Sequence, residues 1–100
     1  MKRLHLYYED GFDNDSVVVQ VDGQEVARKA GLKSSLVTAL AASEDVDVEA
    51  SSPATIRVSV TTRDLSEAIA LDLGAQPHLA IAVRDGKLVL RASGEPFFYL

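Results

Sequence analysis

The acidic segment from Glu9 to Asp15 is the first place in the sequence where side chains of one chemical kind gather. It holds four carboxylates and one amide within seven residues. Ca²⁺ prefers oxygen ligands of this kind, so a calcium site here would use Asp10, Asp13 and Asp15. The spacing is not that of an EF-hand loop. A turn explains the same composition, because Asp, Asn and Gly are the residues that turns favour.

A second acidic run, from Glu44 to Glu49, places carboxylates at alternate positions. In an extended chain, Asp45, Asp47 and Glu49 lie on one face. Paired carboxylates perform general acid–base chemistry in glycoside hydrolases, so this face raises the hypothesis of a small hydrolase. A solvated outer face, with charges that deter aggregation, explains the run without catalysis. We favour the solvated face, since nothing in the run suggests the apolar pocket that raises the pKa of a catalytic acid.

No sequence motif for an enzyme accompanies these carboxylates. The chain has no cysteine, which excludes thiol catalysis, disulfides and cysteine–zinc sites. The two histidines, His5 and His78, are far apart in the sequence, and there is no G-x-S-x-G nucleophile elbow and no Gly-rich phosphate loop. The sequence therefore predicts a protein that is not an enzyme.

The aromatic residues form the third candidate, because all of them lie near the two ends of the chain. The sequence has three tyrosines, three phenylalanines and no tryptophan. The simplest explanation is that the first and last strands are neighbours and that their rings pack together. Alternation in the last strand places Phe98 opposite to Phe97 and Tyr99, so we expect at least one large ring to be exposed. An exposed aromatic strip is typical of a carbohydrate platform or a protein contact. The absence of tryptophan weakens the carbohydrate interpretation. The candidate ligand- or partner-binding residues are Tyr7, Phe12, Phe98 and Tyr99.

The elements that must position these residues are β-strands, and two Asp-Gly pairs mark hairpins. An Asp-Gly pair between alternating segments favours a two-residue type I′ turn. At 22–23 such a turn pairs Val21 with Gln24 and Val19 with Val26. At 85–86 it pairs residue 83 with 88 and residue 81 with 90, apolar against apolar on one face.

Further alternating segments predict strands over 46–48, 56–60 and 69–73, and a short last strand over 97–100. The segment 34–43 fits a short helix or a strand, and the all-β surroundings lead us to prefer the strand. Eight or nine short strands separated by turns predict an all-β, antiparallel β-sandwich, in which residues 1–100 form a single domain.

The bulk properties of the chain limit its partners. Its 100 residues carry 15 acidic and 10 basic side chains, a formal net charge of −5. Binding to a phosphate backbone or an anionic membrane surface needs clustered Lys and Arg, so we expect neither a nucleic acid nor a membrane as partner. The sequence has no apolar run of the length of a signal peptide or a membrane span. We expect a soluble, cytoplasmic protein.

Three segments carry a resemblance: Val21–Val26 (Val-Asp-Gly-Gln-Glu-Val), Ile56–Val60, and the closing Glu95–Leu100 (Glu-Pro-Phe-Phe-Tyr-Leu). In these, the chain resembles a group of short, uncharacterised bacterial β-rich proteins. That group has no established activity, so the resemblance implies no functional residue. The strand pattern is also similar to immunoglobulin-like, prealbumin-like and carbohydrate-binding sandwiches, but one such fold hosts many functions.

These patterns together predict a non-enzymatic binding or protein-interaction domain that needs no cofactor. We expect it to associate with itself, as a homo-oligomer through its edge strands or its terminal aromatic strip, or with another protein. The alternative is a carbohydrate-binding module assisted by Ca²⁺, which would use the 9–15 loop and the terminal tyrosines. A small hydrolase with an acidic strand face is the third hypothesis.

Overall fold

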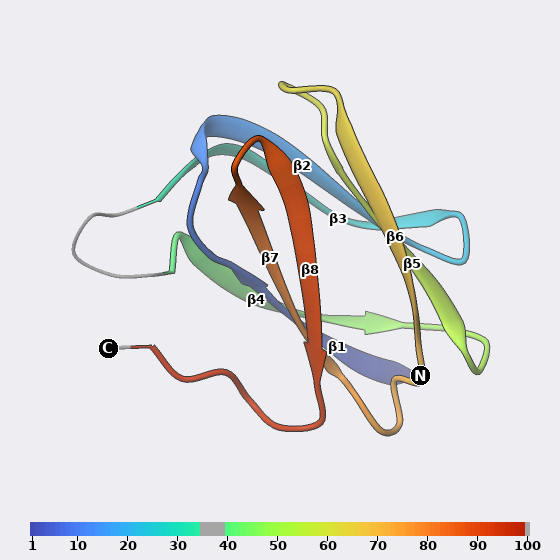
Figure 1. Cartoon of the computed structure of the whole chain (residues 1–100). Helices are drawn as coiled ribbons and strands as arrows, with labels where there is room; N and C mark the ends of the chain where they lie inside the picture. The colour runs from blue at the N-terminus through green and yellow to red at the C-terminus, as the bar shows by residue number, and fades with distance from the viewer. Residues whose placement is uncertain (35–39, 100) are drawn as a thin grey trace.

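Two four-stranded sheets, packed face to face, make up the computed structural model, which describes residues 1–34 and 40–99. No helix occurs in these described residues. Figure 1 shows the strands in chain order. They are β1 (Lys2–Tyr8), β2 (Asp13–Val21), β3 (Gln24–Lys33), β4 (Ala42–Val48), β5 (Ala54–Val60), β6 (Leu65–Leu71), β7 (His78–Arg84) and β8 (Lys87–Ser93). The prediction of an all-β sandwich is confirmed.

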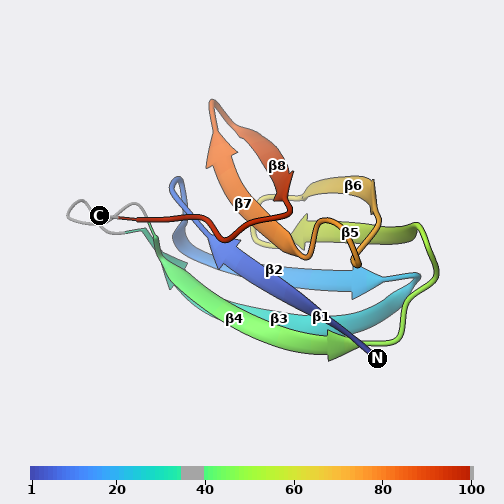
Figure 2. The same cartoon turned by 90° about the horizontal axis from the view of Figure 1, so that it is seen from below.

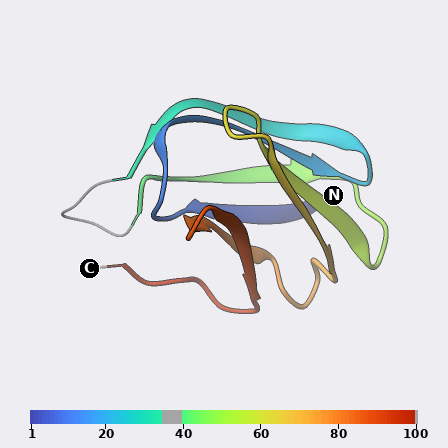
Figure 3. The same ribbon diagram turned by 45° about the horizontal axis from the view of Figure 1, so that its top comes forward.

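The first sheet has the strand order β4-β1-β7-β8, and the second sheet has the order β3-β2-β5-β6. Every neighbouring pair is antiparallel except β1 and β7, which run parallel. Figure 3 shows the two layers, with β2 and β3 above β1 and β4. The parallel pair brings the beginning of the chain beside its last third. The sequence analysis expected the two ends of the chain to be neighbours, but it did not predict a parallel pair.

The hydrophobic core lies between the sheets because each strand turns its alternate, apolar positions inward. In β1 the inward residues Leu4, Leu6 and Tyr8 are at most 1% exposed. The hydroxyl of Tyr8 donates to the Glu44 carboxylate at 2.8 Å, so this buried polar atom has a partner. The opposing layer is built mainly from valines and one isoleucine: Val17, Val19, Val21, Ile56, Val58 and Val60.

The hairpin at Asp85-Gly86 has the predicted register. Asp85 and Gly86 have φ values of 53° and 73°, as a type I′ turn requires. Val83 pairs with Leu88 and residue 81 pairs with residue 90. The prediction for this hairpin is therefore confirmed.

The hairpin at Asp22-Gly23 has the predicted turn but a different register. Val21 pairs with Gln24 as expected, whereas Val19 pairs with Ala27 and not with Val26. A β-bulge between these positions leaves Val26 as the extra residue of β3. The predicted pairing of Val19 with Val26 is therefore wrong, because turn chemistry sets the register only up to the first bulge.

The prediction of a last strand over 97–100 is also wrong, as far as residues 97–99 describe it. β8 ends at Ser93, and residues 94–99 form no strand. Of the ambiguous segment 34–43, residues 35–39 lie outside the described residues, while positions 42 and 43 belong to β4. Within residues 1–34 and 40–99, no helix is long and apolar enough to cross a membrane.

Candidate functional site

The strap, as we name residues 94–99, follows β8 and crosses the outer face of the first sheet. Figure 2 shows this segment running past β1 on the side away from the second sheet. The outward residues Ala80 and Ala82 of β7 are only 1% exposed, although they do not face the core. The outer face of the first sheet is therefore covered at β7.

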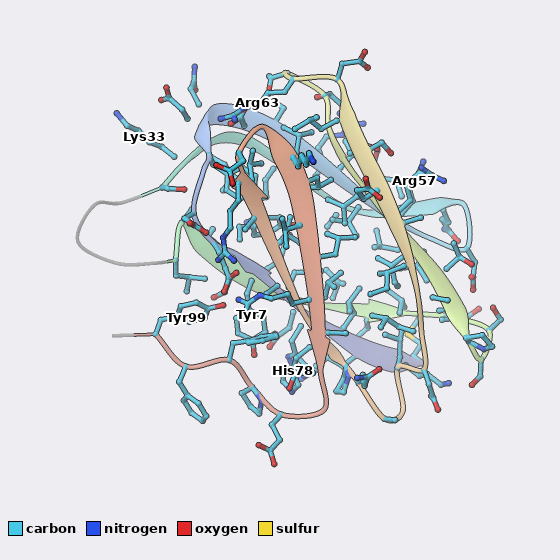
Figure 4. The ribbon with its side chains drawn as sticks, in the orientation of Figure 1. Tyr7, Lys33, Arg57, Arg63, His78 and Tyr99 are labelled. Atoms are coloured by element: carbon cyan, nitrogen blue, oxygen red, sulfur yellow. The ribbon has the colours of Figure 1, made fainter. Side chains whose placement is uncertain are left out.

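Tyr7 is the aromatic residue on which the strap rests. It points outward from β1, because its neighbours in the alternation, Leu6 and Tyr8, point into the core. Its ring meets the edge of the Phe97 ring at 5.2 Å and lies 5.9 Å from the Tyr99 ring. Figure 4 shows Tyr7 and Tyr99 close together. Edge-to-face contacts of this kind stabilise the packing of rings beyond the area that they bury.

Glu9 anchors the strap electrostatically. Its side chain is 5% exposed, and both carboxylate oxygens accept hydrogen bonds at 2.6 Å from Nη2 of Arg91. The Tyr99 hydroxyl donates to the same carboxylate at 2.6 Å. Burial raises the pKa of Tyr99, and the Glu9 carboxylate raises it further, so this hydroxyl keeps its proton at neutral pH. Arg91 also lies over the Phe97 ring, with 5.1 Å between guanidinium and ring centre.

Phe98 is the outward residue of the strap. In an extended chain successive side chains point to opposite sides, and here the residues on either side of it turn toward the sheet. Phe98 is 89% exposed. The predicted alternation of these rings is therefore confirmed, and it leaves one large apolar side chain in solvent on a backbone that is fixed on both sides.

A row of polar rings lies beside the strap on the same outer face. Nδ1 of His5 donates to Asp45 at 2.6 Å, and the His5 ring stacks on the His78 ring at 4.4 Å. The Tyr7 hydroxyl lies 2.8 Å from Nδ1 of His78. Burial lowers the pKa of His78, the charge of His5 lowers it further and Asp45 opposes them, so His78 stays neutral at physiological pH. The row gives Tyr7 a fixed orientation, and the sequence separation of its members explains why the pattern did not reveal it.

Phe12, a predicted contact residue, is not on the surface. It is 3% exposed and its ring meets the ring of Tyr8 edge-on at 6.4 Å inside the core. The prediction that Phe12 contacts a ligand or partner is therefore wrong. The backbone of Phe12 is held by Ser34: its amide donates to the Ser34 hydroxyl at 3.0 Å, and its carbonyl accepts from the Ser34 amide at 2.9 Å.

The three carboxylates predicted to bind calcium have different partners. Asp10 pairs with Arg84 at 3.1 Å, Asp15 pairs with Arg63 at 2.7 Å, and Asp13 lies in β2 opposite residue 33. Figure 4 shows Arg63 far from Tyr7 and Tyr99. Over residues 1–34 and 40–99 no group of three or more metal-binding side chains comes together. The predicted calcium site does not fit this arrangement, because arginines already neutralise two of its carboxylates.

Asp15 makes stability depend on pH. Burial would raise its pKa, but hydrogen bonds from Arg63, Thr62 and the Asp13 amide together lower it below the ordinary value. Such a carboxylate stabilises the fold above its unfolded-state pKa, about 3.9, and this contribution is lost as pH falls through the lower folded-state value. We expect Asp15→Asn to be less stable than the parent at neutral pH.

The stability difference between Asp15→Asn and the parent should shrink on acidification below about pH 4. Urea denaturation at a series of pH values measures it. A difference that stays constant from neutral to strongly acidic pH would show that the charge of Asp15 contributes nothing.

The acidic run of β4 shows no catalytic arrangement. Asp45 and Asp47 are more than half exposed and pair across to β1, Asp47 with Arg3 at 3.1 Å. Asp47 lies beside Val26 and Val48 at the rim of a small opening, but its carboxylate is more than half exposed and is paired with Arg3, so it is not the desolvated acid that glycoside hydrolysis needs. The solvated outer face, with cross-strand ion pairs, is the interpretation that fits the geometry.

The tyrosines of the predicted carbohydrate platform are engaged within the chain, because the Tyr7 ring packs against the rings of Phe97 and Tyr99. Among the predicted contact residues, only Phe98 is free to meet a partner. Glu9 and Arg91, which hold the strap, were missed by the sequence analysis. Glu9 was seen only as part of an acidic loop, and no local pattern links it to a residue 82 positions away.

The comparisons with known proteins gave no match: neither a family model, nor a curated protein, nor a solved structure matches the chain.

Proposed function

We propose that this chain is a non-enzymatic protein-interaction domain that associates through Phe98, with a second copy of itself as the first partner to test. The observation that carries the proposal is the 89% exposure of Phe98 on a strap whose neighbouring rings are held against the first sheet. Interfaces are centred on such aromatic anchors, and preorganised anchors lose little entropy on binding.

The expected size of the contribution of Phe98 follows from its apolar area. Burying a phenylalanine side chain gains about 1.5–3 kcal/mol, which is about tenfold to a hundredfold in Kd. The side chain has no ring contact within its own chain among the described residues. Its removal should therefore weaken association without weakening the fold.

Phe98→Ala tests the proposal by sedimentation velocity from low micromolar to millimolar concentration. We expect the parent chain to associate as concentration rises and Phe98→Ala to need at least about tenfold more protein for the same degree of association. Phe98→Leu, which keeps an apolar side chain, should fall between the two.

Thermal unfolding is the control, and the melting temperatures of the three proteins should agree. A parent chain that stays monomeric over the whole range, or a Phe98→Ala variant that associates as strongly as the parent, contradicts the proposal.

A further inference from the structure

Three Asp-Gly pairs occur in the sequence, at positions 10–11, 22–23 and 85–86. Asp-Gly is the dipeptide in which an aspartate side chain reacts most readily with its own backbone, because glycine has no side chain that hinders the approach to its amide nitrogen. All six residues are exposed, and all three glycines have a positive φ. Sequence and exposure alone therefore do not distinguish the three pairs.

The carboxylates of Asp10 and Asp22 are held by hydrogen bonds. Arg84 donates to Oδ1 of Asp10 from Nε at 3.2 Å and from Nη2 at 3.1 Å. Oδ1 of Asp22 accepts from the Thr55 amide, and Oδ2 accepts from the amide and the hydroxyl of Ser51, each at 2.9 Å. These hydrogen bonds hold the pKa of both aspartates below its ordinary value, so both carboxylates stay ionised at neutral pH.

The carboxylate of Asp85 differs from the other two, because it has no hydrogen bond or ion pair with any residue in 1–34 or 40–99. The neighbouring Arg84 pairs with Asp10 and Glu9 instead. Asp85 and Asp22 occupy the same place in their turns, with φ values of 53° and 49°. The two hairpin tips therefore share their backbone conformation and differ in whether the carboxylate is held.

We propose that Asp85 is a modification site, at which aspartate converts to isoaspartate through a succinimide with water as the only co-reactant. The amide nitrogen of Gly86 attacks Cγ of Asp85, a C–N bond forms, and the carboxyl hydroxyl leaves as water with the amide proton. Water then opens the ring. When it breaks the bond between the ring nitrogen and the α-carbonyl carbon, the main chain runs through Cγ, which is isoaspartate; opening at Cγ restores aspartate.

The hydrogen bonds at the other two pairs explain why the reaction selects Asp85. Ring closure needs a side chain that is free to rotate toward the following amide and a turn that opens for a moment. At Asp10 and Asp22 this movement also breaks hydrogen bonds to a charged carboxylate, which slows closure by about tenfold or more. An ionised carboxylate is in addition a poor target for a nucleophile.

The modification changes the hairpin in which it occurs. Isoaspartate adds one carbon atom to the main chain between β7 and β8, where Arg84 pairs with Lys87 across a two-residue turn. The type I′ turn depends on this length and on positive φ at both of its central positions. This inference is independent of association through Phe98.

Prolonged incubation of the folded protein at neutral pH and physiological temperature tests the proposal. Mass spectrometry with electron-transfer fragmentation distinguishes isoaspartate from aspartate at each position. We expect isoaspartate to form at Asp85 at least about tenfold faster than at Asp10 or Asp22. In urea all three carboxylates lose their partners, so the three rates should become similar. Asp85→Glu should abolish the product at this position, because a glutamate side chain would have to close a larger ring.

Two variants check that the hydrogen bonds make the difference. Arg84→Gln should raise the rate at Asp10 alone, and Ser51→Ala should raise the rate at Asp22 alone; circular dichroism verifies that each is folded, and either one suffices. A folded parent in which Asp85 reacts no faster than the other two, or stays unmodified while the chain in urea reacts, overturns the proposal. Unchanged rates at Asp10 and Asp22 in the folded variants overturn it as well.

Discussion

Replacing Gly11 with alanine is expected to lower the free energy of unfolding by about 3–5 kcal/mol, a cost typical of severe overpacking. Gly11 has a φ of 92°, and a Cβ built on it would lie 1.7 Å from the carbonyl oxygen of Val83. The backbone of Val83 cannot move away easily, because its amide donates to the Asp10 carbonyl at 3.0 Å. The backbones of Gly11 and Val83 approach so closely that only glycine, which has no side chain, fits at this position.

Gly23→Ala is the matched control for this prediction. Gly23 also has a positive φ, 85°, but a Cβ there would meet nothing within 4 Å. Gly23→Ala should therefore lower the free energy of unfolding by only about 1–2 kcal/mol, the cost of placing a non-glycine residue at a positive φ. Urea denaturation of both variants separates the two contributions. If Gly11→Ala is no less stable than Gly23→Ala, the close approach to Val83 does not exist in solution.

Glu9→Gln is expected to release the strap and to lower the free energy of unfolding by about 2–4 kcal/mol. The carboxylate is buried and accepts from Arg91 and from Tyr99. The neutral amide keeps the size of the side chain but removes the charge that these donors face. Both consequences follow from one change, because Glu9 binds Arg91 of β8 and Tyr99 of the strap with the same carboxylate.

Hydrogen exchange of residues 94–99, measured together with denaturation, checks the effect of Glu9→Gln. Exchange in the strap should become faster in this variant and stay unchanged in Phe98→Ala. Tyr99→Phe, which removes only one hydroxyl, should cost about 1 kcal/mol. Unchanged exchange in the strap of Glu9→Gln would mean that Glu9 does not hold it.

Local patterns predicted the fold well where neighbouring residues alone decide the structure. The Asp85-Gly86 hairpin formed with its predicted pairs because turn type and apolar alternation select the same register. The bulge at Val26 could not be predicted, since an inserted residue leaves the turn unchanged and appears only in pairing. The segment after Pro96 was wrongly predicted as a strand, because its side chains, and not a backbone ladder, attach it to the sheet.

The candidate site was predictable only in part, because local alternation shows which way a side chain points but not which distant residue it meets. Alternation placed Phe98 opposite to its two neighbours, and the structure bears this out. The partners that occupy the carboxylates come from distant segments: Arg63 is 48 positions from Asp15, and Arg84 is 74 from Asp10. The contact between Arg84 and Asp10 depends on the parallel pairing of β1 with β7, and no local sequence pattern encodes that pairing.

The most direct test of the central claim, that Phe98 is the contact residue, is ¹⁹F NMR of the chain labelled with 4-fluorophenylalanine. The chain has three phenylalanines, and Phe98→Leu identifies the third signal. We predict that the Phe98 signal is solvent-exposed in dilute protein and shifts or broadens as concentration rises, while those of Phe12 and Phe97 do not. A Phe98 signal that stays the same while the protein associates, or that is shielded from solvent in the monomer, would contradict the account.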